Sequence, residues 1–351
     1  MLPIHVSHSD GIEMFSITVR SEKEDKRIPI AVASDVMFDI QLLLNHIGES
    51  LIAEEFGSHD RPSGVLTERF TLFIDPDSGG ISFKTSTGKG KSALMDKASS
   101  LLALTLDKMG SGSGPYWMED NFKDPRYRCM VLNDLIHLSK HMGLERGYTL
   151  MFSSGGEEKK FVPLDLEKFS AYLKKDARAA ERVVGGILTA VNTKRNVPIY
   201  GFTAGGDRAK ISFLSKDIEN DASGLAGSAV VLKGIARYSE DGGLSEVHDV
   251  SAVRALEKIA FNHMISADRD VPLVVGIEAA VRYDVGTSMW KLGYPDLGIS
   301  SSDKDWDTAV AGFHDYFVFL CDNYLSYGGK ELSDEETEVR DILRKLTGEA
   351  E

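Results

Sequence analysis

The chain has 351 residues, of which 42% are hydrophobic and 27% are charged, and its formal net charge is -14. This length favours two or three domains over a single core, and the composition is ordinary for a globular protein. The apolar runs are short, the first segment lacks a signal-peptide pattern, and the two cysteines, Cys129 and Cys321, are far apart. These features favour a cytoplasmic chain without membrane spans, disulfides or zinc clusters.

Residues 1–150 are predicted to form an α+β domain in which helices cover one face of an antiparallel sheet. The predicted strands are 4–20, with a hairpin turn at Asp10-Gly11, then 28–33, 69–74 and 80–85, and the predicted helices are 34–55, 92–109 and 125–141. Ser34 is the expected cap of the first helix. Asp75-Pro76-Asp77-Ser78-Gly79 joins the last two strands and is a strong turn signal.

Residues 151–250 combine one helix with a run of short strands. Residues 153–160 are predicted to be a polar linker, and 166–183 an amphipathic helix. The strands that follow are predicted over 186–191, 197–203, 209–214, 229–237 and 244–250. Five short strands in about 65 residues indicate a small closed barrel of the SH3-like or OB type, because closure leaves no exposed strand edge.

Residues 251–351 are the third predicted domain. A connecting helix is expected over 252–265, followed by two strands, a Ser/Asp loop and a helix over 305–327. A last helix over 333–346 begins with a capping box, in which Ser333 is the cap and Glu336 lies three residues later. The whole chain is therefore predicted to be a multi-domain α+β protein that ends in a strand-strand-helix module.

Charge is spread unevenly over these three domains. The net charge is -5 over residues 1–150, zero over 151–250 and -9 over 251–351. The middle domain therefore repels a phosphate backbone least, and the last domain repels it most. An acidic C-terminal domain suits a basic protein partner, although solubility alone also accounts for such a charge.

One segment, Thr85-Ser86-Thr87-Gly88-Lys89-Gly90-Lys91-Ser92, is similar to a phosphate-binding loop. It lies between a predicted strand and a predicted helix, and its end matches the pattern G-x-x-x-x-G-K-S. Thr85 replaces the first glycine, and the preceding strand belongs to a predicted hairpin rather than to a parallel sheet. We expect a basic loop here, and a degenerate P-loop of a nucleotide-dependent enzyme is the alternative. The candidate phosphate contacts are Lys89, Gly90, Lys91 and Ser92.

Other sequence motifs of catalysis or metal binding are incomplete in this chain. His137 and His141 are four residues apart on a helix, but Leu138 replaces the glutamate of an H-E-x-x-H motif. A calcium-loop pattern that begins at Asp303 fails at Thr308, where glycine is required. The sequence therefore predicts no catalytic residue, no metal site and no cofactor, and it disfavours an enzyme.

The predicted barrel carries basic residues near its turns and aromatic residues in its strands. Barrels of this kind often bind nucleic acid through loop cations and strand aromatics. The predicted nucleic-acid contacts are Lys194, Arg195, Arg208 and Lys210. Alternation along the strand puts Tyr200 and Phe202 on one face, which is either the core or a binding platform, and we favour the core.

A segment near the C-terminus resembles a known family. Tyr294-Pro295-Asp296-Leu297-Gly298-Ile299 is followed by a Ser/Asp loop, by Trp306-Asp307-Thr308-Ala309-Val310 and by a helix that ends near Leu325. This pattern resembles the HicB-like antitoxin module over about residues 267–327. The resemblance implies a half-size fold of ribonuclease-H type, without a catalytic centre, that neutralises a small RNA-cleaving toxin by binding it. The DNA-binding appendage usual in that family is not visible here.

The helix of this segment is unusually aromatic. Its apolar residues recur at steps of three and four, and further aromatic residues widen the stripe beyond what a two-stranded ribbon covers. Packing within the chain and packing on another chain both remain open. The predicted partner interface consists of Trp306, Phe313, Tyr316, Phe317 and Tyr324.

These observations favour a non-enzymatic, antitoxin-like or defence-associated interaction protein that binds a protein partner through its acidic C-terminal module. The first alternative is a nucleic-acid-binding accessory protein that uses the barrel. The second is a nucleotide-dependent enzyme with the degenerate P-loop. A homo-oligomer is compatible with each, and a membrane partner is not expected.

Overall fold

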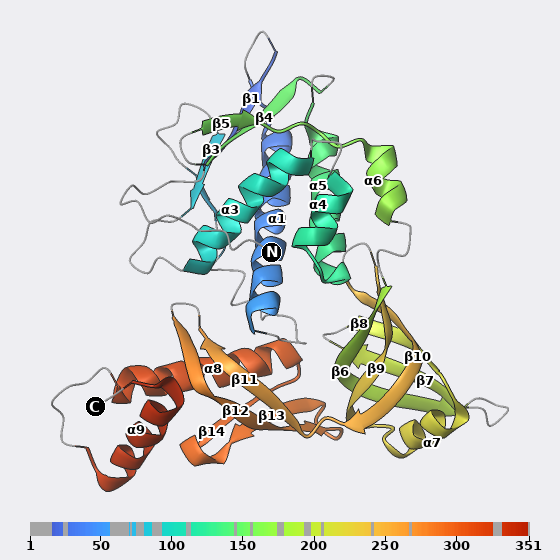
Figure 1. The fold of residues 1–351 in the computed structure, drawn as a ribbon, viewed down its shortest axis with the longest axis vertical. Helices are drawn as coiled ribbons and strands as arrows, with labels where there is room; N and C mark the ends of the chain where they lie inside the picture. Colours follow the sequence, from blue (N-terminus) through green and yellow to red (C-terminus); the bar gives the residue numbers. More distant parts are fainter. Residues whose placement is uncertain are drawn as a thin grey trace.

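Three bodies make up the molecule in a computed structural model of the chain (Figure 1). An α+β domain from the first half of the chain lies above a closed barrel and a C-terminal module, which lie side by side. The fold is the expected multi-domain α+β arrangement of antiparallel sheets, helices and one closed five-stranded barrel. The structure describes residues 16–23, 27–56, 70, 72–74, 81–85, 93–109, 114–143, 146–154, 157–173, 179–192, 198–204, 207–239, 242–266, 269–325 and 332–349.

The N-terminal domain is built on a five-stranded antiparallel sheet with the order β2-β3-β1-β4-β5. Its strands are β1 (Ser16–Ser21), β2 (Leu72–Ile74), β3 (Ile81–Thr85), β4 (Tyr148–Ser154) and β5 (Glu157–Lys160). Ile17 and Val19 of β1 are buried while their neighbours are partly exposed, so one face of the sheet meets the core. The pairing of β2 with β3 confirms the predicted second hairpin. The predicted turns at Asp10-Gly11 and 75–79 lie outside the described residues.

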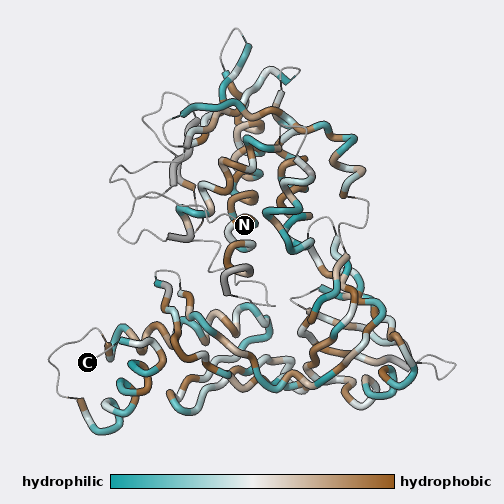
Figure 2. Tube along the Cα trace, in the orientation of Figure 1, coloured by the Kyte–Doolittle hydropathy of each residue, from teal (hydrophilic) through white to brown (hydrophobic). Residues whose placement is uncertain are grey.

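Helices gather on one side of this sheet (Figure 1). They are α1 (Ile30–Phe56), α3 (Ala93–Met109), α4 (Gly114–Asn121), α5 (Pro125–His141) and α6 (Leu166–Leu173). Over Ile30–Ala53, α1 is long and apolar enough to cross a membrane by length and composition, which the short apolar runs of the sequence did not suggest. Its apolar character is visible in Figure 2. Val36, Leu43 and Ile47 of α1 are fully buried in the domain core, so α1 serves here as the central core helix.

The start of α1 and the end of the domain differ from the sequence predictions. The predicted strand over 28–33 is wrong, and Ser34 is not a cap, because α1 already begins at Ile30. Pro29 precedes this first helical residue, where a missing N–H costs nothing and the fixed φ suits a helix. The predicted linker over 153–160 is mostly the β4–β5 hairpin. Phe161 and Phe169 belong to the same core, so the domain extends to about α6 rather than to residue 150.

The second body is a closed barrel with the strand order β10-β8-β7-β6-β9. Its strands are β6 (Ala179–Asn192), β7 (Pro198–Ala204), β8 (Asp207–Phe213), β9 (Ala229–Tyr238) and β10 (Leu244–Ala255), with α7 (Lys216–Gly224) between β8 and β9. All neighbouring strands pair antiparallel except β8 and β10, which pair parallel. This order, with a helix after the third strand, is that of OB-type barrels and decides against the SH3-like alternative.

The first barrel strand is longer than predicted. The helix expected over 166–183 ends at Leu173, and β6 begins at Ala179. Residues 179–187 pair with β9 in an unbroken register. This run includes the β-branched Val183 and Val184 followed by Gly185 and Gly186, residues that favour a strand or weaken a helix. Strand pairing therefore overrides the amphipathic pattern of the local sequence.

The third body, which we call the C-terminal module, is a four-stranded antiparallel sheet with two helices. Its elements are β11 (Lys258–Ile265), β12 (Asp270–Asp284), β13 (Met289–Tyr294), the 3-10 turn η3 (Pro295–Leu297), β14 (Ile299–Asp303), α8 (Trp306–Tyr324) and α9 (Asp334–Thr347). The sheet order is β11-β12-β13-β14, and α8 covers one face. The predicted capping box of Ser333 and Glu336 is present at the start of α9.

The helix predicted over 252–265 is wrong. The chain stays extended instead, because β10 continues to Ala255 along β9 and β11 pairs with β12. Burial along β11 alternates with a period of two, as in a half-buried strand. The module therefore has four strands rather than two, and β10 leads from the barrel directly into it (Figure 1).

Candidate functional site

The outer face of β7 and β8 carries the two predicted cationic contacts that the structure describes. Arg208 lies opposite Thr203, and Lys210 lies opposite Gly201, in the antiparallel register of the two strands. Arg208 and Lys210 alternate with the buried Ala209, so both side chains point away from the barrel core. The structure thus brings these two cations together on one exposed face.

Neither cation has an ion-pair partner within the part of the chain that the structure describes, although Glu246 of β10 lies opposite Lys210 in the parallel register of β8 and β10. Several basic side chains elsewhere do have an acidic neighbour, for example Lys233 with Glu181 at 3.2 Å and Arg182 with Asp124 at 3.6 Å. Among the described residues, Arg208 has no carboxylate within ion-pair distance, and the same holds for Lys210. Lys194 and Arg195 fall in the connection between β6 and β7 and lie outside the described residues.

The aromatic residues of the barrel do not form a stacking platform on this face. Phe202 is 1% exposed and lies in the barrel core, as the favoured interpretation had it. Tyr200 and Phe213 meet edge to face at the end of the barrel near α7, with ring centroids 5.1 Å apart. The outer face of β7 and β8 is therefore cationic and polar in its described part, without an exposed ring.

The N-terminal domain covers a different side of the barrel. Gly242, in the connection between β9 and β10, has a φ of +78°, and a Cβ there would lie 2.3 Å from the side chain of Met130 on α5. Arg182 of β6 pairs with Asp124, which caps α5. These contacts fix the barrel on α5 through β6 and the β9–β10 connection.

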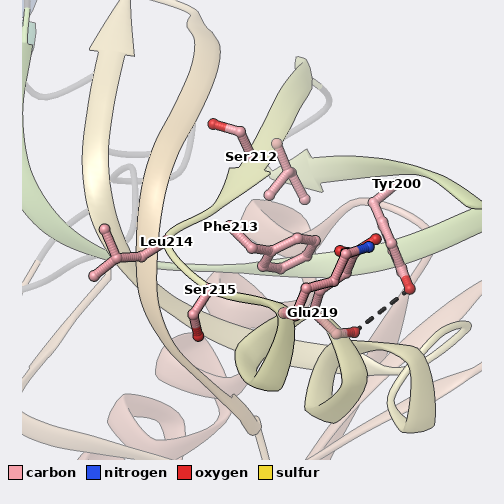
Figure 3. Close-up of a pocket in the computed structure, with 8 residues that line it drawn as sticks. Tyr200, Ser212, Phe213, Leu214, Ser215 and Glu219 are labelled. Atoms are coloured by element: carbon pink, nitrogen blue, oxygen red, sulfur yellow. Dashed lines mark hydrogen bonds and ion pairs between the residues drawn. The ribbon is translucent and has the colours of Figure 1, made fainter.

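A pocket of about 510 Å³ lies next to the cationic face, at the α7 end of the barrel (Figure 3). Its lining residues are Tyr200, Ile211, Ser212, Phe213, Leu214, Ser215, Lys216 and Glu219. The sequence had indicated Tyr200 only as a strand aromatic, and it had not predicted α7. The sequence feature that could have predicted α7 is Ser215 followed by Asp217 and Glu219. A serine cap with acidic residues in the first turn is typical of the start of a helix.

A second cluster of ionisable groups lies between α1 and α5. His46 Nδ1 is 2.6 Å from Asp134 Oδ2, and both side chains are largely buried. Burial raises the pKa of Asp134, against the hydrogen bond from His46. Burial, followed by the charges of Asp134 and Asp35, raises the pKa of Asp39 to about 7.

The two histidines that were considered as metal ligands both lie on α5. They lie at the edge of the cluster of Asp39, His46 and Asp134 and not inside it. His137 is exposed, and His141 Nε2 lies 3.8 Å from Asp39 Oδ2. Within the described ranges, no three acidic, histidine or cysteine side chains are placed to hold a metal ion. The sequence had missed Asp39, His46 and Asp134, because a helical period does not reveal which polar residues two helices bury between them.

Most of the aromatic stripe of α8 lies inside the C-terminal module. Trp306, Phe313 and Phe317 are 7%, 0% and 0% exposed, so these three predicted interface residues are covered by the chain itself. Phe313 stacks on Phe261 of β11, with ring centroids 5.5 Å apart. The predicted partner interface is therefore wrong for these three residues, because the sheet has four strands and covers more of α8 than two strands would.

Two aromatic side chains in the described part of α8 are exposed to solvent. Tyr316 is 42% exposed and Phe319 is 56% exposed, and their rings stack with centroids 6.1 Å apart. Tyr324, the fifth predicted interface residue, is partly buried against the module core. The exposed remainder of the stripe is thus a pair of neighbouring rings on the outer side of α8.

The phosphate-loop candidate has the wrong strand context for a nucleotide site. β3, which precedes it, lies between β1 and β2 in an antiparallel sheet, whereas a P-loop follows a strand of a parallel sheet. Lys89, Gly90, Lys91 and Ser92 themselves lie outside the described residues.

Comparisons of the chain with protein-family models, with curated proteins and with solved structures found no match.

Proposed function

We propose that this chain is a non-enzymatic binding protein whose barrel holds single-stranded nucleic acid across the outer face of β7 and β8. The observation that carries the proposal is the pair of exposed cations without acidic partners, Arg208 and Lys210, on the second and third strands of an OB-type barrel. In such barrels this face and its flanking loops are a common site for oligonucleotides.

The chemistry of the face favours contacts to phosphates over contacts to bases. Lysine and arginine neutralise phosphates and release condensed counterions, which supports binding without sequence preference. In sequence, Lys194 and Arg195 lie between β6 and β7, so they are two further candidate phosphate contacts. Since no aromatic ring lies on the described face, we expect affinity to depend strongly on salt.

The test uses the full-length chain with labelled DNA and RNA strands of about 12 nucleotides, a length typical of one such barrel. In Arg208→Ala/Lys210→Ala, we expect weaker binding of both strands and a slope of log K against log salt that is reduced by about 1.4, or about 0.7 for each lost phosphate contact. The matched control is Arg282→Ala/Lys345→Ala, which removes one exposed arginine and one exposed lysine from the C-terminal module.

Two results would count against the proposal. The wild-type chain fails to bind either strand at low salt, or the control variant weakens binding as much as the barrel variant does. A second pair, Lys194→Ala/Arg195→Ala, asks whether the β6–β7 connection adds to the same salt dependence. Tighter binding of RNA than of DNA would assign contacts to the 2′-hydroxyl.

A second function is favoured by the C-terminal module, which we propose binds a basic protein partner through the outer side of α8. Tyr316 and Phe319 form an exposed aromatic pair in the domain that carries a net charge of -9. The order β13, η3, β14, α8, with Gly298 in the left-handed conformation and Asp305 as the helix cap, agrees with the layout that the HicB-like resemblance implies. That resemblance supports a small RNA-cleaving protein as the partner.

Co-purification with the full-length chain tests this second function. We expect a small basic protein to be retained by the wild type and lost in Tyr316→Ser/Phe319→Ser, because exposed aromatic side chains often dominate interface energies. The control is Val285→Ser, which removes a 63% exposed apolar side chain from the β12–β13 turn of the same module. Equal losses in the control, or retention of the partner by the double variant, would contradict the assignment.

A further inference from the structure

The pocket at the α7 end of the barrel begins where β7 and β8 stop pairing. Their register runs from Ala204–Asp207 to Gly201–Lys210. Beyond that point β8 continues along β10, with Ile211 opposite Val247 and Phe213 opposite Val250. The pocket lies just past the last pair, between the separated strands and the start of α7 (Figure 3).

Apolar and aromatic side chains form one part of the pocket lining, and serine, lysine and glutamate residues form the other part. The rings of Tyr200 and Phe213 stand at 87° to each other and form one corner. Ile211 and the 62% exposed Leu214 complete the apolar lining. A volume of about 510 Å³ is within the range of small-molecule sites and is ample for one planar ring system.

Polar groups at the pocket rim come from the start of α7. The ammonium of Lys216 lies 3.0 Å from a carboxylate oxygen of Glu219. Lys216 is 86% exposed, whereas Glu219 is 22% exposed, so the carboxylate is the group held against the pocket. The hydroxyl of Tyr200 donates a hydrogen bond of 3.5 Å to the main-chain carbonyl of Glu219. The pocket thus combines aromatic walls with one strong hydrogen-bond acceptor.

This pocket adjoins the cationic face at the end of β8, where Ser212 belongs to that face and Ile211 and Phe213 belong to the opposite, barrel side of the strand. Arg208, Lys210 and Ser212 follow one another at alternate positions of β8, and Ser212 already lines the pocket. A strand whose phosphates lie on the two cations would therefore pass the pocket mouth. In protein–nucleic acid contacts, unstacked bases of single strands commonly insert against aromatic side chains and are read by hydrogen bonds at their edges.

We infer that the pocket receives one unstacked nucleobase of a strand bound across β7 and β8, and that it selects a base with an exocyclic amino group. The amino group of cytosine donates to the Glu219 carboxylate, as carboxylates accept from this group in base recognition. Uracil has a carbonyl oxygen at the same position, which the carboxylate repels. This inference rests on the proposed nucleic-acid function and adds a base preference to it.

The test compares strands of cytidine with strands of uridine, as DNA and as RNA, because the two bases differ only at C4 and N3, where uracil has a carbonyl oxygen and an N–H in place of the amino group and the bare ring nitrogen. Binding of strands of about 12 nucleotides to the full-length chain is measured by fluorescence anisotropy. We expect the wild type to bind the cytosine strand about tenfold more tightly, as one hydrogen bond to a charged acceptor allows. In Glu219→Met the two affinities are expected to become equal, with the salt slope unchanged.

The matched control is Lys216→Met, which breaks the same ion pair and leaves the acceptor in place. It should keep the cytosine preference. A third variant, Ser212→Leu, places an apolar side chain at the pocket mouth and should also abolish the preference, so the result does not depend on the folding of one variant. Melting temperatures near that of the wild type confirm folding.

Equal affinities of the wild-type chain for the two bases would overturn the inference. So would a Glu219→Met variant that keeps the preference. In both cases salt-dependent binding lost in Arg208→Ala/Lys210→Ala would leave the proposed function standing. A chain that binds neither strand would instead remove the proposed function and the base pocket together.

Discussion

The barrel and the C-terminal module both contain a series of aromatic residues, and the two series lie in different environments. In the barrel, Phe202 is in the core, and Tyr200 and Phe213 close the end near α7. In the module, Phe313 and Phe317 are fully buried, but the stripe is wider than the covering sheet. The described outer face of β7 and β8 therefore exposes cationic side chains and no aromatic ring. The described part of α8, in contrast, exposes two aromatic rings in an acidic domain.

This difference shows that rings become accessible where the element that covers them ends. Alternation in a strand places every second residue inside a closed barrel, so the described barrel rings are accessible only at its end, where Tyr200 and Phe213 line the pocket near α7. A helix presents a stripe, and residues at the margin of the stripe stay outside when the sheet ends. The two surfaces also differ in charge, so we expect them to attract partners of opposite charge.

The largest expected effect on stability distinguishes the buried part of the aromatic stripe of α8 from its exposed part. Phe313→Ala should destabilise the module by about 3–5 kcal/mol, since it removes a fully buried ring and leaves a cavity. Phe319→Ala should change the stability by less than about 0.5 kcal/mol, as is usual for exposed positions. Denaturant unfolding of both variants checks this difference. Equal destabilisation would mean that Phe319 is covered, and that the exposed aromatic pair does not exist.

A partly exposed histidine of α8, His314, whose ring packs on Phe261, makes the module sensitive to acid. Burial lowers the pKa of His314 from 6.5 to about 4, and its Nδ1 accepts a hydrogen bond of 3.1 Å from the main-chain N–H of Ile265. The unfolded chain therefore binds a proton between pH 6.5 and 4 that the folded module does not bind. Stability is fully present above about pH 6.5 and falls by about 3 kcal/mol as the pH drops to 4.

Hydrogen exchange of α8 and β11 measured at several pH values checks this prediction. His314→Gln should flatten the dependence, because glutamine does not titrate in this range. The barrel offers an internal reference, since its described histidine, His248, lies on the surface beside Asp249. A parallel loss of protection in the barrel strands would show that His314 is not the cause.

The helical layer of the N-terminal domain should respond to pH in the opposite direction. Asp39 keeps its proton in the folded state up to about pH 7, whereas the unfolded chain releases it near pH 3.8. The stability of this domain therefore falls as the pH rises from about 4 to 7. Asp39→Asn should be more stable than the wild type at pH 8, by about 1–3 kcal/mol, and similar to it at pH 4.

Asp35→Asn is the control for this substitution. Asp35 lies on the same helix, one turn before Asp39, and its side chain is 56% exposed. It should have a much smaller effect at either pH. A stabilisation by Asp39→Asn that is equal at pH 4 and pH 8 would indicate a change in packing rather than the removal of a buried charge.

The sequence predicted the existence and order of the five barrel strands, but it predicted β6 and β10 too short. Alternating burial and turn residues mark the middle of each strand, so there the local signals agree with the fold. The helix predicted over 252–265 failed because Ala, Leu, Glu and Lys favour a helix locally, while pairing of β11 with β12 decides the structure. Such pairing involves partners that no local window contains.

The candidate site was only partly predictable for the same reason. Arg208 and Lys210 were identified because basic residues near predicted turns are visible in sequence. Their lack of acidic partners and the pocket beside them became visible only with the register of β7 and β8 and the position of α7. Glu219 had no signal of its own, because its role depends on where α7 lies against the barrel.

The smallest expected effect on stability is also the one that separates binding from folding in the barrel. Arg208→Ala/Lys210→Ala should change the free energy of unfolding by less than about 0.5 kcal/mol, because both side chains are exposed and neither has an ion-pair partner among the described residues. If the two cations do not stabilise the barrel but do determine the salt dependence of nucleic-acid binding, they act in the complex and not in folding. Thermal unfolding without nucleic acid, compared with unfolding in its presence, measures both quantities. A large loss of stability in the free protein would instead mean that the two cations stabilise the fold. The outer face of β7 and β8 would then not be a binding surface comparable to the acidic, aromatic surface of α8.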